Sequence, residues 1–355
     1  MAGGVDVSAG DQQYDRMEML KAFDQTEAGV KGLIDSGLTK IPKIFVRPSE
    51  DLAQELPYKN IQIQVPVVDL SGILDADGRK QIVEQVRIAS ETWGFFQVVN
   101  HGISPTVLDG MIDGIRKFNE MDVEEKRRYY SRDYTRRVRY SSNFDLFASK
   151  TANWRDTLSI SFSDLIDSEE LPASCRDSTM EYSNRVKILG KTLFELLSEA
   201  LGLSPDHLNN MECSKVHQFS CHYYPACPEP QLTLEPANTL TLDSSLFFYK
   251  VKSVASRFCI KITGLTLNPF QELVSNGRFI SNKHRVTANS IGPRISVACF
   301  FSGPVGEVKT YGPIKELISE ENPAKYRDLL LTEYVGKFLK TGLDDEIWGI
   351  DYCKL

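Results

Sequence analysis

The chain has 355 residues, of which 41% are hydrophobic and 10% aromatic, and its formal net charge is −7. This composition indicates a globular protein with a sizeable core, and the mild acidity argues against nucleic acid and anionic membranes as partners. No apolar run approaches the ~20 residues that span a bilayer and the N-terminus carries no secretory signal, so we expect a cytoplasmic protein, and we expect it to be a monomer. The seven cysteines are scattered and lack a CxxC pair, which indicates reduced thiols.

The N-terminal part of the chain is patterned mainly as helices with a few short strands. Residues 1–14 are small and polar, and we expect them to be disordered. Thr26 is a candidate N-cap for a helix that ends at Gly37, and Ser104-Pro105 is a typical helix start. Apolar spacing predicts further helices at 16–23, 77–93 and 178–201, a charged and solvated helix is expected at 122–130, and strands are expected at 65–70, 94–100, 137–140 and 154–162.

From Val216 onward the pattern changes to short, regularly spaced strands separated by turns. Such spacing is typical of an all-β sandwich or jelly roll. The expected strands lie at 217–224, 232–248, 256–267, 278–280 and 294–301, and helices return at 313–319 and 324–341. The predicted architecture is therefore a mostly β core with flanking helices.

One expected strand, Arg294–Phe301, carries candidate site residues. Because side chains alternate along a strand, Arg294 and Ser296 project from the same face. A guanidinium beside a hydroxyl suits a carboxylate, and His284 just upstream suggests a metal or a general base next to it. The alternative is an arginine on an exposed sheet face with a histidine nearby by chance. From these residues alone both interpretations stay open.

Several separate motifs of the chain resemble those of a known protein family. They are Leu20–Asp24, Ala28–Leu33, Trp93–Ile103, Trp154–Thr157 and His222–Pro228. Their types and order resemble the plant 2-oxoglutarate- and iron(II)-dependent dioxygenases, and most nearly the group of 1-aminocyclopropane-1-carboxylate oxidase homologues. The resemblance runs from about Met17 to Phe338.

The resemblance implies a double-stranded β-helix, or jelly roll, as one of four regions of the chain. Residues 1–14 precede it, 15–212 form an N-terminal region of the non-haem dioxygenase type, 213–305 form the jelly-roll domain, and 306–355 form a C-terminal helical cover. It also implies Fe(II) as cofactor with 2-oxoglutarate as cosubstrate, O2, and ascorbate as a reductant. The implied activity is hydroxylation, desaturation or demethylation of a small organic substrate of plant specialised metabolism.

The resemblance also implies site residues, and here the chain departs from the family. Tyr224, Arg294 and Ser296 would bind the remote carboxylate of 2-oxoglutarate, and His284 would be the distal iron ligand. The chain's histidines are His101, His207, His217, His222 and His284, so none lies between His222 and His284, where the family has a His-x-Asp pair.

Two alignments of that stretch are possible. Asp243 as the carboxylate ligand puts Thr241 where the histidine belongs, whereas an ungapped count puts Thr239 and Thr241 at the two ligand positions. We favour Asp243, because the residues after it resemble those after the family motif. His222 is not a replacement ligand, since relatives with an intact motif carry histidine or asparagine there, and His101 is expected in a turn.

The jelly-roll region is also shorter than the family pattern near 244–263, which predicts a truncated or rebuilt strand and an exposed sheet edge. Two hypotheses follow. The protein is an active oxygenase of this family, or it is a catalytically impaired member that retains the fold and a 2-oxoglutarate-binding pocket.

Overall fold

The structure is a computed structural model. It describes residues 8–53, 64–162, 166–233, 247–253, 262–266, 269–281, 288–304, 308–341 and 349–355. Its main feature is one eight-stranded sheet in the order β1-β2-β7-β6-β8-β5-β4-β3, beside a separate pair of β10 and β9. The strands are β1 (Val67–Asp69), β2 (Phe95–Val99), β3 (Val138–Ser142), β4 (Asp156–Ser161), β5 (Val216–Tyr224), β6 (Phe247–Ser253), β7 (Ile262–Thr266), β8 (Arg294–Ser302), β9 (Thr310–Tyr311) and β10 (Leu329–Leu330).

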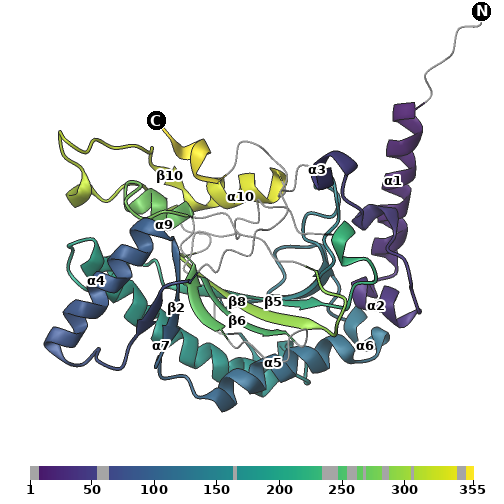
Figure 1. Ribbon diagram of the computed structural model, residues 1–355, viewed down its shortest axis with the longest axis horizontal. Coiled ribbons are helices and arrows are strands. Elements are labelled where there is room, and N and C mark those ends of the chain that lie inside the picture. The colour runs from purple at the N-terminus through teal and green to yellow at the C-terminus, as the bar shows by residue number, and fades with distance from the viewer. Residues whose placement is uncertain are drawn as a thin grey trace, which may run out of the picture.

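Helices cover this sheet on both sides. The α-helices are α1 (Ser8–Gln25), α2 (Gly29–Asp35), α3 (Ser49–Ala53), α4 (Ala76–Thr92), α5 (Pro105–Glu120), α6 (Val123–Arg127), α7 (Arg176–Ala200), α8 (His207–Asn210), α9 (Pro269–Val274) and α10 (Leu331–Thr341). Single 3-10 turns are η1 (Lys43–Phe45), η2 (Ser168–Glu170), η3 (Pro230–Leu232), η4 (Lys315–Leu317) and η5 (Gly349–Cys353). In Figure 1, α5 and α7 lie below the curved sheet, and α9 and α10 lie above it. The predicted mixture of a sheet core and flanking helices is thus confirmed.

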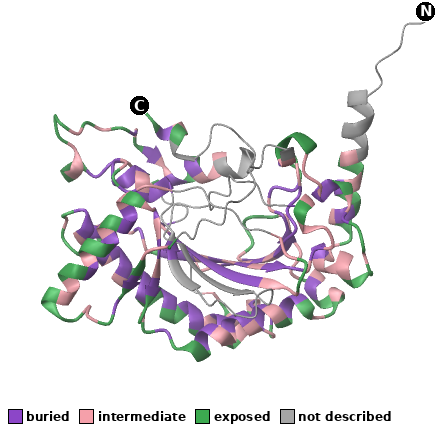
Figure 2. Cartoon of the chain, viewed as in Figure 1, coloured by how far each residue is buried: buried purple, intermediate pink, exposed green. Residues whose placement is uncertain are grey.

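The core lies between the sheet and α5 and α7, where Figure 2 shows the buried residues concentrated. Alternate residues of the central strands face these helices. They are apolar and buried, and include Leu158 and Ile160 of β4, Phe219 and Cys221 of β5, and Val297 and Cys299 of β8. Because side chains alternate along a strand, the residues between these apolar ones lie on the opposite, inner face of the sheet.

A close contact between α7 and β8 sets how the site-bearing strand lies. Phe301 packs edge-on against Phe194, with ring centroids 5.9 Å apart. It also lies over Gly190, where an added Cβ would come within 2.3 Å of the Phe301 ring. Gly190 is thus required by close approach rather than by backbone conformation, and it lets α7 pack directly on β8.

Most predicted elements are found within a few residues, but the helix expected at 313–319 is only the 3-10 turn η4, and the helix expected at 324–341 begins at Leu331. Four further predictions are wrong. The first helix begins at Ser8, inside the stretch expected to be disordered. The residues expected as a strand at 278–280 follow α9 as bends. The helix at α6 is not simply solvated, since Lys126 is buried and donates to the Asn119 carbonyl at 3.0 Å.

The fourth wrong prediction concerns Thr26, which does not cap α2. Its hydroxyl donates to the Phe23 carbonyl at 2.7 Å and accepts from the Ala28 amide at 3.3 Å, closing the turn before the helix. The amides of Val30 and Lys31, which open the helix, donate instead to Asp156, each at 2.8 Å. The cap therefore comes from β4, far along the chain.

The exposed edge expected from the shortened region is not found among the described strands. β7 pairs antiparallel with β6 on one side and with β2 on the other, so a strand of the N-terminal region completes the sheet there. The edge strand beyond β2 is the three-residue β1, and short edge strands limit unwanted pairing. Thr239, Thr241, Asp243 and His284 lie outside the described residues.

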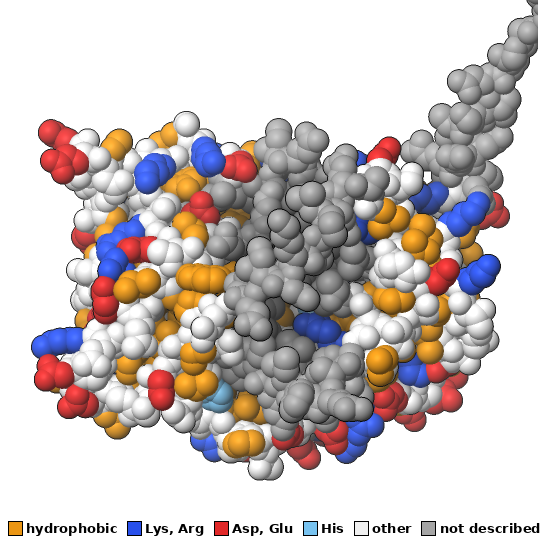
Figure 3. Space-filling model, in the orientation of Figure 1, with side chains coloured by type: hydrophobic (Ala, Val, Ile, Leu, Met, Phe, Trp, Pro, Cys, Tyr) orange, Lys and Arg blue, Asp and Glu red, His pale blue; other side chains and the backbone are white. Residues whose placement is uncertain are grey.

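The described helices include none that is both long and apolar enough to cross a membrane. Figure 3 shows acidic and basic side chains interspersed over the described part of one face of the molecule. The six described cysteines are buried and none is in a disulfide, and burial raises the pKa of each thiol, which makes these thiols poorly reactive.

Candidate functional site

The candidate site lies on the inner face of the sheet, where β5 and β8 pair along their whole length. The antiparallel register places Tyr224 opposite Arg294 and His222 opposite Ser296. Directly opposite residues on one face of an antiparallel pair are in side-chain contact range. The sequence-predicted residues Tyr224, Arg294 and Ser296 are therefore brought together, as neighbours on two adjacent strands.

Arg294 is the centre of this group. Its guanidinium carbon lies 4.8 Å from the centre of the Tyr224 ring, and Nη1 donates to the Ser296 hydroxyl at 3.4 Å. Tyr224 and Ser296 are almost fully buried, whereas Arg294 is half-buried. The ring and the hydroxyl hold the guanidinium in one orientation while part of it stays accessible. Such a preorganised guanidinium suits a planar anion, because it can make two parallel charge-assisted hydrogen bonds.

A further pair extends the polar surface from β5 to β4. Thr157 is opposite His222, and its Oγ1 lies 3.0 Å from the Nδ1 atom of the imidazole. Burial, and next the charges of Arg155 and Arg294, holds the pKa of His222 well below its usual range. His222 is therefore a neutral imidazole at physiological pH.

β4 carries this surface on one face and an anchor for the N-terminal helices on the other. Trp154 packs edge-on against Phe45 at 5.0 Å, and its indole donates to the Pro225 carbonyl at 3.2 Å. Asp156 is fully buried and accepts from the α2 amides and from the Ser142 hydroxyl. Burial raises the pKa of Asp156, and these hydrogen bonds oppose that rise.

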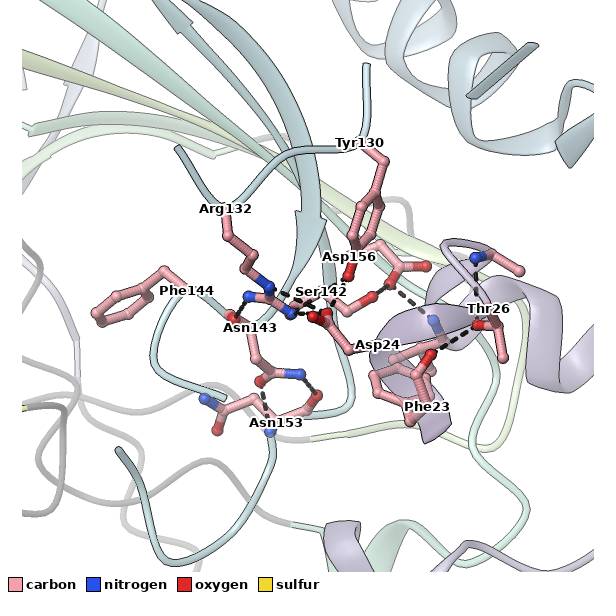
Figure 4. Close-up of polar contacts among 12 residues, drawn as sticks. Phe23, Asp24, Thr26, Tyr130, Arg132, Ser142, Asn143, Phe144, Asn153 and Asp156 are labelled. Atoms are coloured by element: carbon pink, nitrogen blue, oxygen red, sulfur yellow. Dashed lines mark hydrogen bonds and ion pairs between the residues drawn. The ribbon is translucent and has the colours of Figure 1, made fainter. Parts of the chain in front are cut away.

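Figure 4 shows a second carboxylate, Asp24, at the same corner. The Arg132 guanidinium donates to Asp24 from Nε at 3.0 Å, and Tyr130 donates its hydroxyl to the same oxygen. Arg132 also donates to the Ser142 carbonyl at 2.8 Å, which ties the end of α1 to the end of β3. The motif residues Asp24 and Asp156 thus have a structural explanation: they fix α1 and α2 to the strands that carry the candidate site.

Two further described histidines, His101 and His217, have local partners. The Ile103 amide donates to His101 Nδ1 at 3.2 Å, so His101 is the turn residue that was predicted. His217 faces the helices, stacks on Phe162 at 4.6 Å, and its Nε2 lies 2.7 Å from the Ser183 hydroxyl. The described residues contain no group of three side chains suited to a metal ion, and both proposed iron ligands lie outside them.

The sequence did not identify Thr157 and His222 as neighbours of Arg294 and Ser296. Alternation within Trp154–Thr157 does place Thr157 on the face opposite to Asp156. What it cannot give is the pairing of β4 with β5, because the residues that meet are 65 positions apart in the chain.

Comparisons with known proteins identify the family of the chain. Residues 65–180 match the family described as non-haem dioxygenase in morphine synthesis N-terminal, and residues 215–303 match the 2OG-Fe(II) oxygenase superfamily. The 1-aminocyclopropane-1-carboxylate oxidase homolog 1 of Arabidopsis thaliana is 46% identical over 360 residues, which cover 96% of this chain and 97% of that protein. The 1-aminocyclopropane-1-carboxylate oxidase homolog of Solanum lycopersicum is 43% identical over 352 residues, which cover 94% of this chain and 96% of that protein.

Solved structures show the same fold. The crystal structure of JOX2 in complex with 2OG, Fe and JA is 25% identical and superposes with a TM-score of 0.72, covering 92% of this chain and 97% of that one. The dioxygenase for auxin oxidation of rice is 19% identical with a TM-score of 0.62, covering 82% of this chain and all of that one, and supports the fold alone. The chain belongs to the 2OG-Fe(II) oxygenase superfamily, and within it to the plant group of 1-aminocyclopropane-1-carboxylate oxidase homologues.

Proposed function

We propose that the protein is a 2-oxoglutarate- and Fe(II)-dependent oxidoreductase that hydroxylates, desaturates or demethylates a small organic substrate of plant specialised metabolism. Fe(II) is the cofactor of this superfamily and 2-oxoglutarate its cosubstrate. The observation that carries the proposal is the oriented guanidinium of Arg294 between Tyr224 and Ser296.

In this proposal the remote carboxylate of 2-oxoglutarate binds at Arg294. Two guanidinium hydrogens donate to its oxygens, and the Ser296 hydroxyl donates to one of them. The stacked Tyr224 ring keeps water from the far side of the guanidinium, since both Tyr224 and Ser296 are nearly buried. Electrostatic attraction strengthens when water is excluded, so this pocket favours a dianion over a neutral ligand.

The donor set for iron is incomplete in the sequence. Asp243 and His284 are the residues we propose as ligands, and Thr241 stands where the family has its first histidine. When bound, iron supplies the site at which O2 is reduced as 2-oxoglutarate is decarboxylated to succinate and CO2. A threonine hydroxyl is a weak ligand for Fe(II), so we expect the iron affinity to be at least about 10–100-fold below that of a complete ligand set.

The inner face next to the carboxylate pocket suits a small polar substrate. The half-exposed positions on β4 and β5 carry short or uncharged polar side chains: Thr157, Ser159, Ser161, Gln218, Ser220 and His222. The similar structure of JOX2 was solved with JA, and this relative makes a small organic molecule the expected substrate class. We further propose a jelly-roll domain and a monomeric, cytoplasmic protein.

Anaerobic titration of the purified protein with Fe(II) and 2-oxoglutarate tests the proposal. We expect a charge-transfer absorption band at saturating ligand and, once O2 is admitted, succinate. Absence of both would contradict the proposed activity. Thr241→His should then restore iron binding if Asp243 is the carboxylate ligand, whereas rescue by Thr239→His would show that the ungapped alignment is correct.

A further inference from the structure

Arg139 of the edge strand β3 repeats the arrangement that holds Arg294 on β8. Its guanidinium carbon lies 4.7 Å from the centre of the Tyr134 ring, against 4.8 Å between Arg294 and Tyr224. Nη1 of Arg139 donates to the Tyr134 carbonyl at 3.1 Å, and the Tyr134 hydroxyl donates to the Phe144 carbonyl at 2.7 Å. The ring is thus fixed at its far end, and both its face and the carbonyl of the same residue orient the guanidinium.

Alternation along β3 places the Arg139 side chain on the inner face of the sheet. Val138 and Tyr140 are buried toward the helices, and the Tyr140 ring packs edge-on against Phe118 of α5 at 5.5 Å. The residue between them therefore faces the opposite way, as Arg294 does on β8. Arg139 is half-buried, so part of its side chain remains accessible.

The register extends this position across the sheet as a row of polar side chains. Arg139 is opposite Ser159 of β4, and Ser159 is opposite Ser220 of β5. Both serines are half-buried. Directly opposite side chains on one face are about 5 Å apart at Cβ, so a guanidinium and a neighbouring hydroxyl can donate to the same anion. Arg294 and Ser296 present the same pair of groups on β8.

Arg139 lies too far from Arg294 for one short anion to bind both. β4 and β5 lie between β3 and β8, and three strand spacings amount to about 14 Å across the sheet. A five-carbon dicarboxylate extends roughly 5 Å between its carboxyl carbons. Each guanidinium is also held beside its own tyrosine. An anion bound at Arg139 therefore belongs to a second molecule.

We propose that Arg139, together with Ser159, binds the carboxylate of the primary substrate, and that the substrate class is a small monocarboxylic acid. Tyr134 is a positioning residue that acts through Arg139. The inference rests on the proposed function in that the second molecule is the substrate oxidised beside 2-oxoglutarate. It differs from a purely structural Arg139–Tyr134 pair at the sheet edge, which predicts no preference for an ionised ligand.

Calorimetric titration with matched acids and amides at pH 7.5 tests this. The probes are benzoate, phenylacetate, 3-phenylpropionate and hexanoate, each beside its primary amide. They are added to the full chain in EDTA, with and without saturating 2-oxoglutarate, and again with Fe(II) under argon. At least one acid should bind at least about tenfold more tightly than its amide, because it adds a charge-assisted pair. Equal affinities in every acid–amide pair would overturn the assignment.

Variants of the row then locate the preference. Arg139→Gln should weaken binding of the preferred acid by at least about tenfold and leave its amide within about twofold. Arg139→Lys keeps the charge but not the planar fork, and should retain a preference of about threefold. Tyr134→Leu and Ser159→Ala should each weaken binding of the acid by about threefold to tenfold.

Arg136→Gln is the matched control. It removes the same charge from an exposed residue in the turn before β3, and it should leave the affinities for acid and amide unchanged. Wild-type acid preference in Arg139→Gln would overturn the proposal. An equal loss in Arg136→Gln would do so too, because the preference would then depend on net charge and not on the row.

The outcomes separate this inference from the proposed function. If the wild type binds 2-oxoglutarate and Arg139→Gln keeps the acid preference, the proposed function stands and the role of Arg139 is wrong. If the acid preference depends on Arg139 but 2-oxoglutarate does not bind, the anion site stands and its assignment to a substrate fails with the proposed function. If Arg139→Gln does not fold, wild-type acid preference in both Arg139→Lys and Tyr134→Leu overturns the proposal.

Discussion

The two faces of β4 carry groups of opposite kind. On one face the Asp156 carboxylate is buried and accepts hydrogen bonds from Val30, Lys31 and Ser142. On the other, the half-exposed Thr157 leads through His222 to Ser296 and Arg294, a row of polar side chains that ends at the guanidinium. A polar group whose partners are all internal stabilises the fold, whereas a set of donors aimed at one accessible position favours a ligand. The contrast predicts that substitutions on the two faces affect different quantities.

The largest effect on stability is expected from Asp156→Ala. The substitution leaves two amides and a hydroxyl buried without their acceptor, and should lower the free energy of unfolding by about 3 kcal/mol or more. Urea unfolding at pH 7 measures this. The folded fraction should still bind 2-oxoglutarate within about fivefold of the wild type. Loss of binding without loss of stability would contradict the division between the two faces.

A smaller effect on stability is expected from the pH dependence of His217, one of the two histidines of β5. His217 packs on the helix side, where burial lowers its pKa to about 4, so the folded protein favours the neutral form. This stability is fully present above the unfolded pKa of about 6.5 and is lost as the pH falls toward 4. By pH 5 the loss should be about 2 kcal/mol. Urea unfolding of the wild type and of His217→Gln at pH 7 and pH 5 checks it: the variant should lose less between the two values. Equal losses would place the acid sensitivity elsewhere.

The smallest effect is expected from Thr26→Ala. Thr26 closes an exposed turn while Asp156 satisfies the first amides of α2, so the substitution should cost about 0.5 kcal/mol. Substitution by alanine of a residue that capped the helix would lower the free energy of unfolding by about 1 kcal/mol or more. Unfolding curves of Thr26→Ala and Asp156→Ala, measured together, rank the two. A larger cost for Thr26→Ala would reverse the capping assignment.

Local patterns in the sequence predicted much of this molecule, and non-local pairings account for the rest. The alternation in Arg294–Phe301 predicted that Arg294 and Ser296 share a face, because a period of two is a property of the strand itself. The capping of α2 by Asp156 could not be predicted, since residues 126 positions apart meet only after the sheet has formed. Thr26, three residues before the first residue of α2, was a plausible but wrong local candidate for the cap.

The same limit applied to the site. The family motifs identified Tyr224, Arg294 and Ser296, and the register of β5 with β8 places them together. The neighbours Thr157 and His222 depended on the register of β4 with β5, which no sequence period encodes. Asp243 and His284 remain predictions from the resemblance.

The most direct test of the inner face as a carboxylate site is the affinity of 2-oxoglutarate for wild type and Arg294→Gln, measured beside their free energies of unfolding. We predict a loss of at least about 30-fold in affinity, as expected for a charge-assisted pair, with a change in unfolding free energy below about 0.5 kcal/mol. Equal affinities, or a loss of affinity explained by unfolding of the variant, would contradict the account.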